Sequence, residues 1–121
     1  MLEREVLYRG KFHTVELAVT ANGRCPGKDF IESLSKANRA KVLKIIERVA
    51  DEGKVASREQ FKKIEGENFF ELKKFQIRMP CYFQPGGRLI ITHGFIKKTD
   101  SMGQAEINRM RRIRHEYEQR T

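Results

Sequence analysis

Six side chains that can carry a positive charge, besides Arg88, fall within one stretch, FFELKKFQIRMPCYFQPGGRLIITHGFIKK, at residues 69–98. They are Lys73, Lys74, Arg78, His93, Lys97 and Lys98. Each interrupts or follows a run of apolar residues, so we expect them to converge on one side of a short antiparallel sheet. The sequence contains no phosphate-binding glycine loop, no nucleophile elbow and no metal-ligand spacing. We therefore expect no metal and no cofactor.

A cluster of cations without a metal can cleave RNA, because the 2′-hydroxyl of RNA supplies the nucleophile. The protein must align that hydroxyl, remove its proton, stabilise the charge that develops on the phosphate and protonate the 5′-oxygen. A lysine crowded by other cations has a lowered pKa and can act as a base, and histidine can act as acid or base near neutral pH. A phosphate-binding surface without cleavage is the alternative interpretation.

Side-chain alternation assigns the residues of 75–83 to two faces of a strand. Phe75, Ile77, Met79, Cys81 and Phe83 share one face, which we expect to be buried, while the opposite face presents Arg78 and Tyr82. There Arg78 is available for a phosphate or for the Glu71 carboxylate, and Tyr82 for stacking on a base or for packing.

Three features of the sequence bear on the strands that surround residues 75–83. Phe70 and Leu72 have the other parity, which predicts a turn or bulge at Lys73 and Lys74. Pro80 favours an edge or irregular strand because it lacks an N–H group. Leu89–Ile96 is typical of a central strand covered on both faces. His93 has the parity of the apolar residues there, and its orientation, toward the cations or toward the core, stays open.

The remaining elements position this stretch. We expect one or two strands in 5–19, a loop over Asn22–Gly27, a helix opened by an Asp29/Glu32 capping box, and a second helix capped by Asn38 and ended by Gly53. A strand at Phe61–Glu65 follows. A last helix, capped by Ser101 with Gln104, buries Ile107, Met110, Ile113 and Tyr117 and exposes arginines, of which Arg111 and Arg112 are RNA-binding candidates.

The charge of the chain favours a polyanionic partner. Its 121 residues include 25 Lys+Arg and 16 Asp+Glu, a net charge of +9. The excess is +2 in residues 1–53 (10 basic, 8 acidic) and +7 in residues 54–121 (15 basic, 8 acidic). We expect one domain over 1–121, with Cys25 and Cys81 neither disulfide-bonded nor ligating zinc. The charged start and the lack of a long apolar segment predict a cytoplasmic protein without a membrane span.

Three segments in sequence, FFELKKFQIRMPCYF, GGRLIITHGFIKKT and QAEINRM, resemble the RelE/HigB-like toxins of the RelE/ParE superfamily, in particular their phage-derived branch. The resemblance covers about residues 14–118. It implies an α+β fold in which a twisted antiparallel sheet carries an N-terminal helical hairpin and a C-terminal helix. It also implies a ribosome-dependent endoribonuclease, an mRNA interferase that cuts messages in the ribosomal A site. A cognate antitoxin, often with a helix-turn-helix, is implied as its partner.

By position, Lys73 matches the basic residue of the family's Glu-Leu-basic element, and Arg78 the arginine before the next apolar run. His93, Lys97 and Lys98 match its His-Gly-Phe-x-Lys-Lys segment. These five are the catalytic candidates, and Lys74, Tyr82, Arg111 and Arg112 are the RNA-binding candidates. Where many relatives have Lys-Thr-Pro before the last helix, this chain has Ser101, Met102 and Gly103.

Two other functions stay open on the sequence. One is a non-catalytic toxin of the ParE kind, which binds DNA gyrase, and the other is an RNA-binding regulatory module without cleavage. The oligomeric state, the codon or base preference and the residue that acts as acid or base also stay open.

Overall fold

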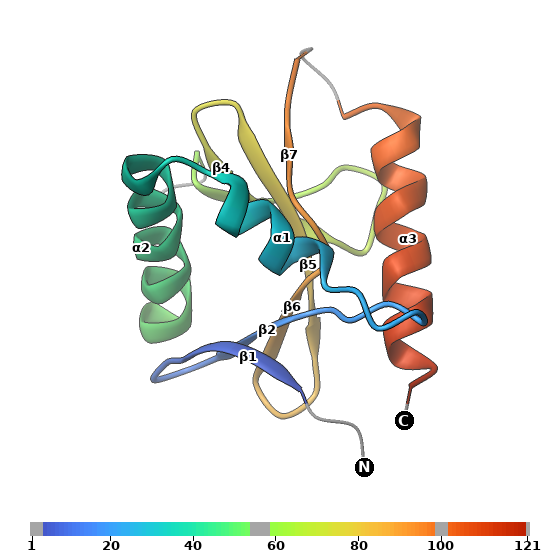
Figure 1. Cartoon of the computed structure of the whole chain (residues 1–121). Helices are drawn as coiled ribbons and strands as arrows, with labels where there is room; N and C mark the ends of the chain where they lie inside the picture. The colour runs from blue at the N-terminus through green and yellow to red at the C-terminus, as the bar shows by residue number, and fades with distance from the viewer. Residues whose placement is uncertain (1–3, 54–58, 99–101, 121) are drawn as a thin grey trace.

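Seven strands and three helices make up the residues that this computed structural model describes, 4–53, 59–98 and 102–120. In chain order they are β1 (Glu5–Arg9), β2 (Thr14–Leu17), α1 (Pro26–Ser33), α2 (Lys36–Glu52), β3 (Phe61–Lys63), β4 (Phe70–Lys74), β5 (Ile77–Gln84), β6 (Arg88–Ile91), β7 (Phe95–Ile96) and α3 (Gln104–Glu118). The strands form one sheet, with α1 and α2 on one side and α3 on the other (Figure 1). The α+β class is confirmed.

The sheet is mixed, so the prediction of a wholly antiparallel sheet was wrong. Its strand order is β1-β2-β6-β5-β4-β3, with β7 added against the start of β5. The pairings between the described strands are antiparallel except that of β2 with β6, where Val15 lies beside Leu89. Parallel neighbours need a crossover, and the chain between them supplies both helices. The helical hairpin is also not N-terminal, because β1 and β2 precede it.

Two hydrophobic cores lie on the two faces of this sheet. On the side of α1 and α2, the core contains Ile77, Met79 and Cys81, as side-chain alternation predicted. On the other side, Tyr82 and Ile90 pack with three residues of α3, namely Met110, Ile113 and Tyr117. Of the two alternatives for Tyr82, stacking on a base or packing, the structure therefore shows packing, because α3 covers its ring. The predicted apolar side of the last helix is confirmed, with Ile107 packed at its margin.

The turn between β4 and β5 falls at Phe75 and Gln76, not at the two lysines. Lys73 and Lys74 are the last residues of β4 and lie opposite Arg78 and Ile77. Phe75 has a φ of 54°, the positive value that a two-residue hairpin needs at its first loop position. The sequence did not show this turn because that position usually holds glycine, asparagine or aspartate.

Pro80 lies in the interior of the sheet, since β5 has β4 on one side and β6 on the other. The residues before Pro80 pair with β7 and those after it pair with β6. Pro80 thus lies where β5 changes its partner, and its carbonyl accepts a hydrogen bond of 2.9 Å from the Thr92 backbone N–H. Of the two predicted alternatives, an edge or an irregular strand, the edge was wrong, and the change of partner is the irregularity that tolerates a residue without an N–H.

The helix starts differ from the predicted caps. The cap of α1 is Cys25, with Asp29 in the first turn, and that of α2 is Ser35, whose Oγ accepts from the Asn38 N–H at 3.2 Å. The α2 end at Gly53, with a φ of 74°, is confirmed. The cap of α3 is Gly103, which has no side chain to accept a bond, and Ser101 lies outside the described residues.

Candidate active site

Strand register places several charged side chains on the α3 side of the sheet. Lys73 lies directly opposite Arg78 across β4 and β5, and Lys62 of β3 lies opposite Glu71 of β4. Opposed residues of paired strands point to the same face, as do residues two apart on one strand. Lys62, Glu71, Lys73 and Arg78 therefore share a face. Lys97 reaches the same hairpin end, because its N–H donates to the Gln76 carbonyl at 2.7 Å.

The surroundings of Lys73 destabilise its ammonium form. Burial lowers the pKa of Lys73 from its ordinary value, and the charges of Lys62 and Arg78 lower it further. Glu71 acts in the opposite direction, and Lys97 adds a smaller lowering of the pKa. Only the unprotonated amine can accept a proton, and a lowered pKa makes that form more populated near neutral pH. The shift is in the direction that a general base requires.

Arg78 is held rigidly beneath the hairpin. The residue is 8% exposed, and its Nη1 donates to the carbonyls of Phe75 at 2.7 Å and Ile77 at 2.9 Å. Its Nε lies 3.9 Å from Oε1 of Glu71 and has no hydrogen-bond partner within the described residues. Arg78 therefore brings a fixed positive charge beside Lys73, which suits stabilisation of a phosphate.

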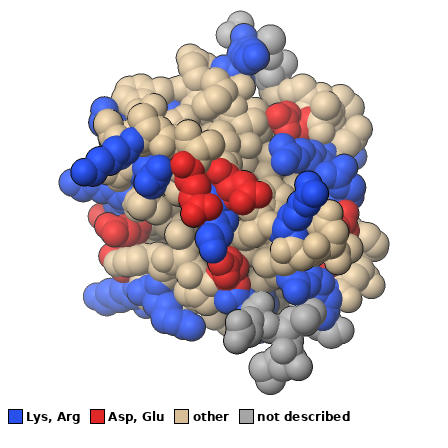
Figure 2. All heavy atoms as spheres, viewed as in Figure 1, with Lys and Arg blue, Asp and Glu red and all other residues tan. Residues whose placement is uncertain are grey.

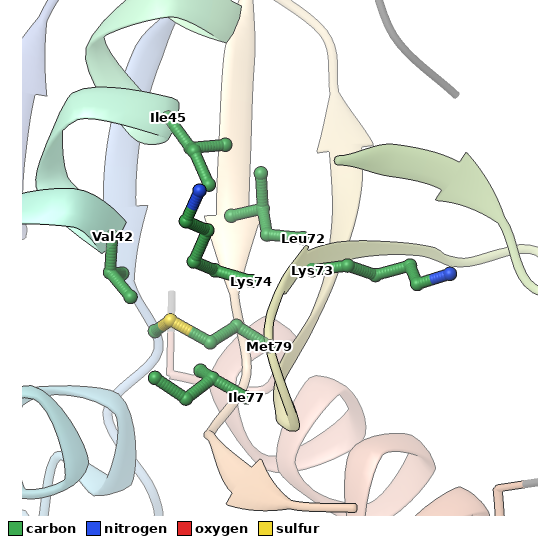
Figure 3. Close-up of a pocket in the computed structure, with 7 residues that line it drawn as sticks. All are labelled: Val42, Ile45, Leu72, Lys73, Lys74, Ile77 and Met79. Carbon is green, nitrogen blue, oxygen red and sulfur yellow. The ribbon is translucent and has the colours of Figure 1, made fainter. Parts of the chain in front are cut away.

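Lys74 points to the opposite side of the sheet from Lys73 (Figure 3). There it lines a hollow with mainly apolar side chains, Val42, Ile45, Leu72, Ile77 and Met79, and Figure 3 shows Lys73 directed away from them. This hollow is part of the packing of α2 on the sheet and lacks converging polar groups among the residues described. We therefore place the candidate site on the face of Lys73 and Arg78, apart from Lys74.

His93 lies between the sheet and α3 rather than at the surface. It is 1% exposed, with Nε2 at 3.1 Å from Oε1 of Glu106 and Nδ1 at 3.0 Å from the Thr92 hydroxyl. Burial, followed by the charges of Arg109 and Arg112, lowers its pKa to about 3. A neutral ring protonated at Nε2 donates to Glu106. His93 thereby joins the segment after β6 to the first turn of α3.

The other predicted residues are distributed over α3 and the end of the sheet. Tyr82 is 1% exposed, and its hydroxyl donates to Glu118 at 2.7 Å, which leaves no ring face for a base. Arg111 is paired with Glu67, and Arg112 lies 3.5 Å from Glu116. Lys98 is exposed, one residue after Lys97. The register brings together Lys73 and Arg78, with Lys97 at the same end of the hairpin.

Lys62 was missed in the sequence, where it stands in a short strand between two charged turns. Only the pairing of β3 with β4 shows that it shares the face of Lys73. The distribution of charge on the surface does not single out Lys62 either. Figure 2 shows Lys and Arg side chains toward both the α2 and the α3 side, with acidic side chains gathered between them. Strand register, rather than net charge, shows that Lys62, Lys73 and Arg78 share one face of the sheet.

Replacing Lys62 with alanine is expected to raise the pKa of Lys73, because one of the charges that destabilise its ammonium form is removed. The measurement is the pH dependence of acylation of the Lys73 amine, followed by mass spectrometry, with the reactive range moving to higher pH. Lys63→Ala is the matched control, since Lys63 is also exposed but lies opposite Phe70 on the other face. Equal shifts in both variants would contradict the geometry.

The described part of the chain offers neither a metal cluster nor a membrane-spanning helix. Within 4–53, 59–98 and 102–120, no group of three His, Cys, Asp or Glu side chains is placed to hold a metal ion. Over the same ranges, every helix is too short or too polar to cross a membrane.

Comparison with known proteins places the chain in a family. Residues 29–115 match the family described as "Phage derived protein Gp49-like (DUF891)". None of the curated proteins matches the chain. The matched family is RelE/HigB-type toxin-like, consistent with the toxin of a toxin–antitoxin pair, and this implies a cognate antitoxin as partner. Because the match spans well over half of its residues, the chain belongs to the Gp49-like family of phage-derived proteins.

Proposed function

We propose that this protein is the toxin of a type II toxin–antitoxin pair and a ribosome-dependent endoribonuclease of the RelE/HigB kind. In this proposal residues 1–121 act as one domain in the cytoplasm, where the ribosomal A site presents a translated message. A cognate antitoxin, of the helix-turn-helix type in this proposal, neutralises it. Family membership supports the toxin, and the arrangement of cations supports the chemistry.

The observation that carries the proposal is the direct pairing of Lys73 with Arg78 on one face of β4 and β5. It joins a lysine of lowered pKa to an arginine fixed by two backbone carbonyls. One group is suited to remove a proton and the other to stabilise negative charge, which are two of the requirements for cleavage by the 2′-hydroxyl.

In the proposed reaction, the neutral amine of Lys73 removes the proton of the 2′-hydroxyl, and the 2′-oxygen attacks the adjacent phosphorus. Arg78 stabilises the negative charge on the non-bridging oxygens, together with Lys97 or Lys98. The bond to the 5′-oxygen breaks, and a protonated lysine of that pair donates a proton to it. The products are a 2′,3′-cyclic phosphate and a 5′-hydroxyl.

His93 has no acid–base step in this mechanism. With a pKa of about 3 the ring is neutral near neutral pH and has no imidazolium proton to give to a leaving group, and Glu106 and Thr92 occupy both ring nitrogens. We propose a structural role for His93 instead, together with Tyr82, whose ring is packed beneath α3.

The test is inducible expression of the wild type in a bacterial host, with 5′ ends of translated messages mapped minutes after induction. Wild type is expected to produce cuts in phase with codons, and Lys73→Gln is expected to produce none and to permit growth. Lys63→Gln loses the same charge on the other face of the sheet and is expected to cut as wild type does.

Two outcomes would overturn the proposal. Growth arrest with intact messages and broken chromosomal DNA would indicate a gyrase-binding toxin. Unimpaired growth with wild-type protein present at normal levels would indicate a regulatory module.

A further inference from the structure

The tip of the β4–β5 hairpin presents an aromatic ring to solvent. Phe75 is 59% exposed, more than the other large apolar residues described as exposed. Its φ of 54° crowds a Cβ against the backbone, and glycine would occupy this loop position without strain. A residue that keeps strained geometry at an exposed position suggests that its side chain is used.

Two ammonium groups lie over this ring at cation–π distance. Lys41 of α2 has its Nζ 4.9 Å from the centroid of Phe75, and Lys74 of β4 has its Nζ 5.0 Å from the same centroid. Proteins bind single-stranded nucleic acid with exposed rings and nearby cations, because the ring stacks on a base and the cations attract phosphates. Here a base would replace an ammonium group on the ring face, and the displaced cation would bind the adjoining phosphate. The chemistry of this tip therefore fits an unpaired nucleotide.

The same tip is bonded to the candidate active site. The carbonyl of Phe75 accepts the 2.7 Å hydrogen bond from Nη1 of Arg78, and Lys73 precedes Lys74 on β4. A nucleotide on the ring is thus held by the turn that also fixes Arg78. We propose that Phe75, with Lys41 and Lys74, forms a stacking platform for an unpaired base of the RNA substrate, next to the linkage that is cleaved. This rests on the proposed function and adds a binding site to it.

The platform also assigns a role to Lys74. Lys74 points away from Lys73, so it takes no part in the proposed reaction, yet it lies beside Phe75. In the platform it attracts a phosphate on the α2 side of the hairpin while Lys73 and Arg78 act on the other side. The substrate strand then passes over the hairpin tip from one face to the other.

The experiment uses the absence of tryptophan from the chain, which makes Phe75→Trp a variant with a single fluorescent indole. It is titrated with a short unstructured oligoribonucleotide at low salt. Saturable quenching of its emission is expected, as the indole stacks on a base. Phe12→Trp is the matched control, because Phe12 is 54% exposed and has Lys11 Nζ at 5.6 Å from its ring centroid. Absent quenching in the Phe75→Trp variant, or equal quenching in both variants, would overturn the platform.

A second variant separates the ring from the fold. Phe75→Gly suits the positive φ and is expected to leave the unfolding midpoint close to that of the wild type. Its affinity for a labelled oligoribonucleotide is expected to fall at least about fivefold, as stacking on one base contributes about 1–3 kcal/mol. Unchanged affinity would overturn the platform. The two proposals can fail separately, because quenching measures binding and not cleavage. If the Phe75→Trp variant is quenched but the wild type leaves messages uncut, the ribonuclease is refuted and the platform is not.

Discussion

Replacing Arg78 is expected to slow cleavage strongly in two variants that differ in stability. In single-turnover cleavage of ribosome-bound mRNA, Arg78→Ala and Arg78→Lys are each expected to slow the reaction by about 10²–10³, the usual loss when one preorganised charge-stabilising donor is removed. Lysine fails here because it lacks the planar fork that Phe75 and Ile77 hold by their carbonyls.

Stability distinguishes the two variants. Arg78→Ala leaves the buried carboxylate of Glu71 without its cation, 3.9 Å away in the wild type, and is expected to lower the free energy of unfolding by about 3–5 kcal/mol. Arg78→Lys keeps a positive charge there and is expected to lose less. Urea denaturation measures both losses. Adding Glu71→Gln to Arg78→Ala removes the unpaired charge and is expected to restore part of the stability without restoring cleavage. Recovery of cleavage in the double variant would show that Arg78 serves only the fold.

Removing the carboxylate of Glu16 is expected to destabilise the fold strongly. Glu16 is 1% exposed, receives hydrogen bonds from Arg88 at 2.6 and 3.0 Å, and accepts one of 2.8 Å from the Tyr117 hydroxyl. It therefore ties β2 to β6 and α3 at once. Glu16→Ala leaves a largely buried arginine and hydroxyl unpaired, with an expected loss of about 3–5 kcal/mol in the free energy of unfolding.

Two further measurements check this prediction. Glu5→Ala removes a carboxylate paired at 3.1 Å with Lys28 at the surface, and is expected to cost less than about 1 kcal/mol. Burial raises the pKa of Glu16, but hydrogen bonds from Arg88 and Tyr117 outweigh it and hold the pKa below its ordinary value. The wild type therefore has this stabilisation above the ordinary carboxyl pKa and loses it as the pH falls through the lowered one. Equal losses in both variants would contradict the assignment.

The pattern of apolar residues along the sequence predicted those features of the fold that depend on residues close together in the chain. Alternation placed Ile77, Met79 and Cys81 in one core, and helical spacing placed Met110, Ile113 and Tyr117 in the other. Gly53 ended its helix because a left-handed residue is needed there. Each of these follows from the geometry of a single strand or helix.

What the sequence did not reveal depends on segments that meet only in the folded chain. Alternation along β5 cannot show that α3 covers Tyr82, and the parallel neighbour of β2 lies about seventy residues away in the sequence. The parity of His93 grouped it with Leu89 and Ile91, but β6 ends at Ile91 and the ring turns to Glu106 on α3. Lys62 joined the site only through the register of β3.

The parallel pairing of β2 with β6 also bears on synthesis of the chain. Leu17 leaves the ribosome long before Arg88, and at about 5–20 residues per second the intervening segment takes roughly 4–14 s to make. During that interval one edge of β2 has no partner, and an unpaired edge can recruit other chains. β7 and α3, which follow β6, are made later still. Newly made copies are therefore most prone to aggregation in the interval before β6 has been made and can pair with β2.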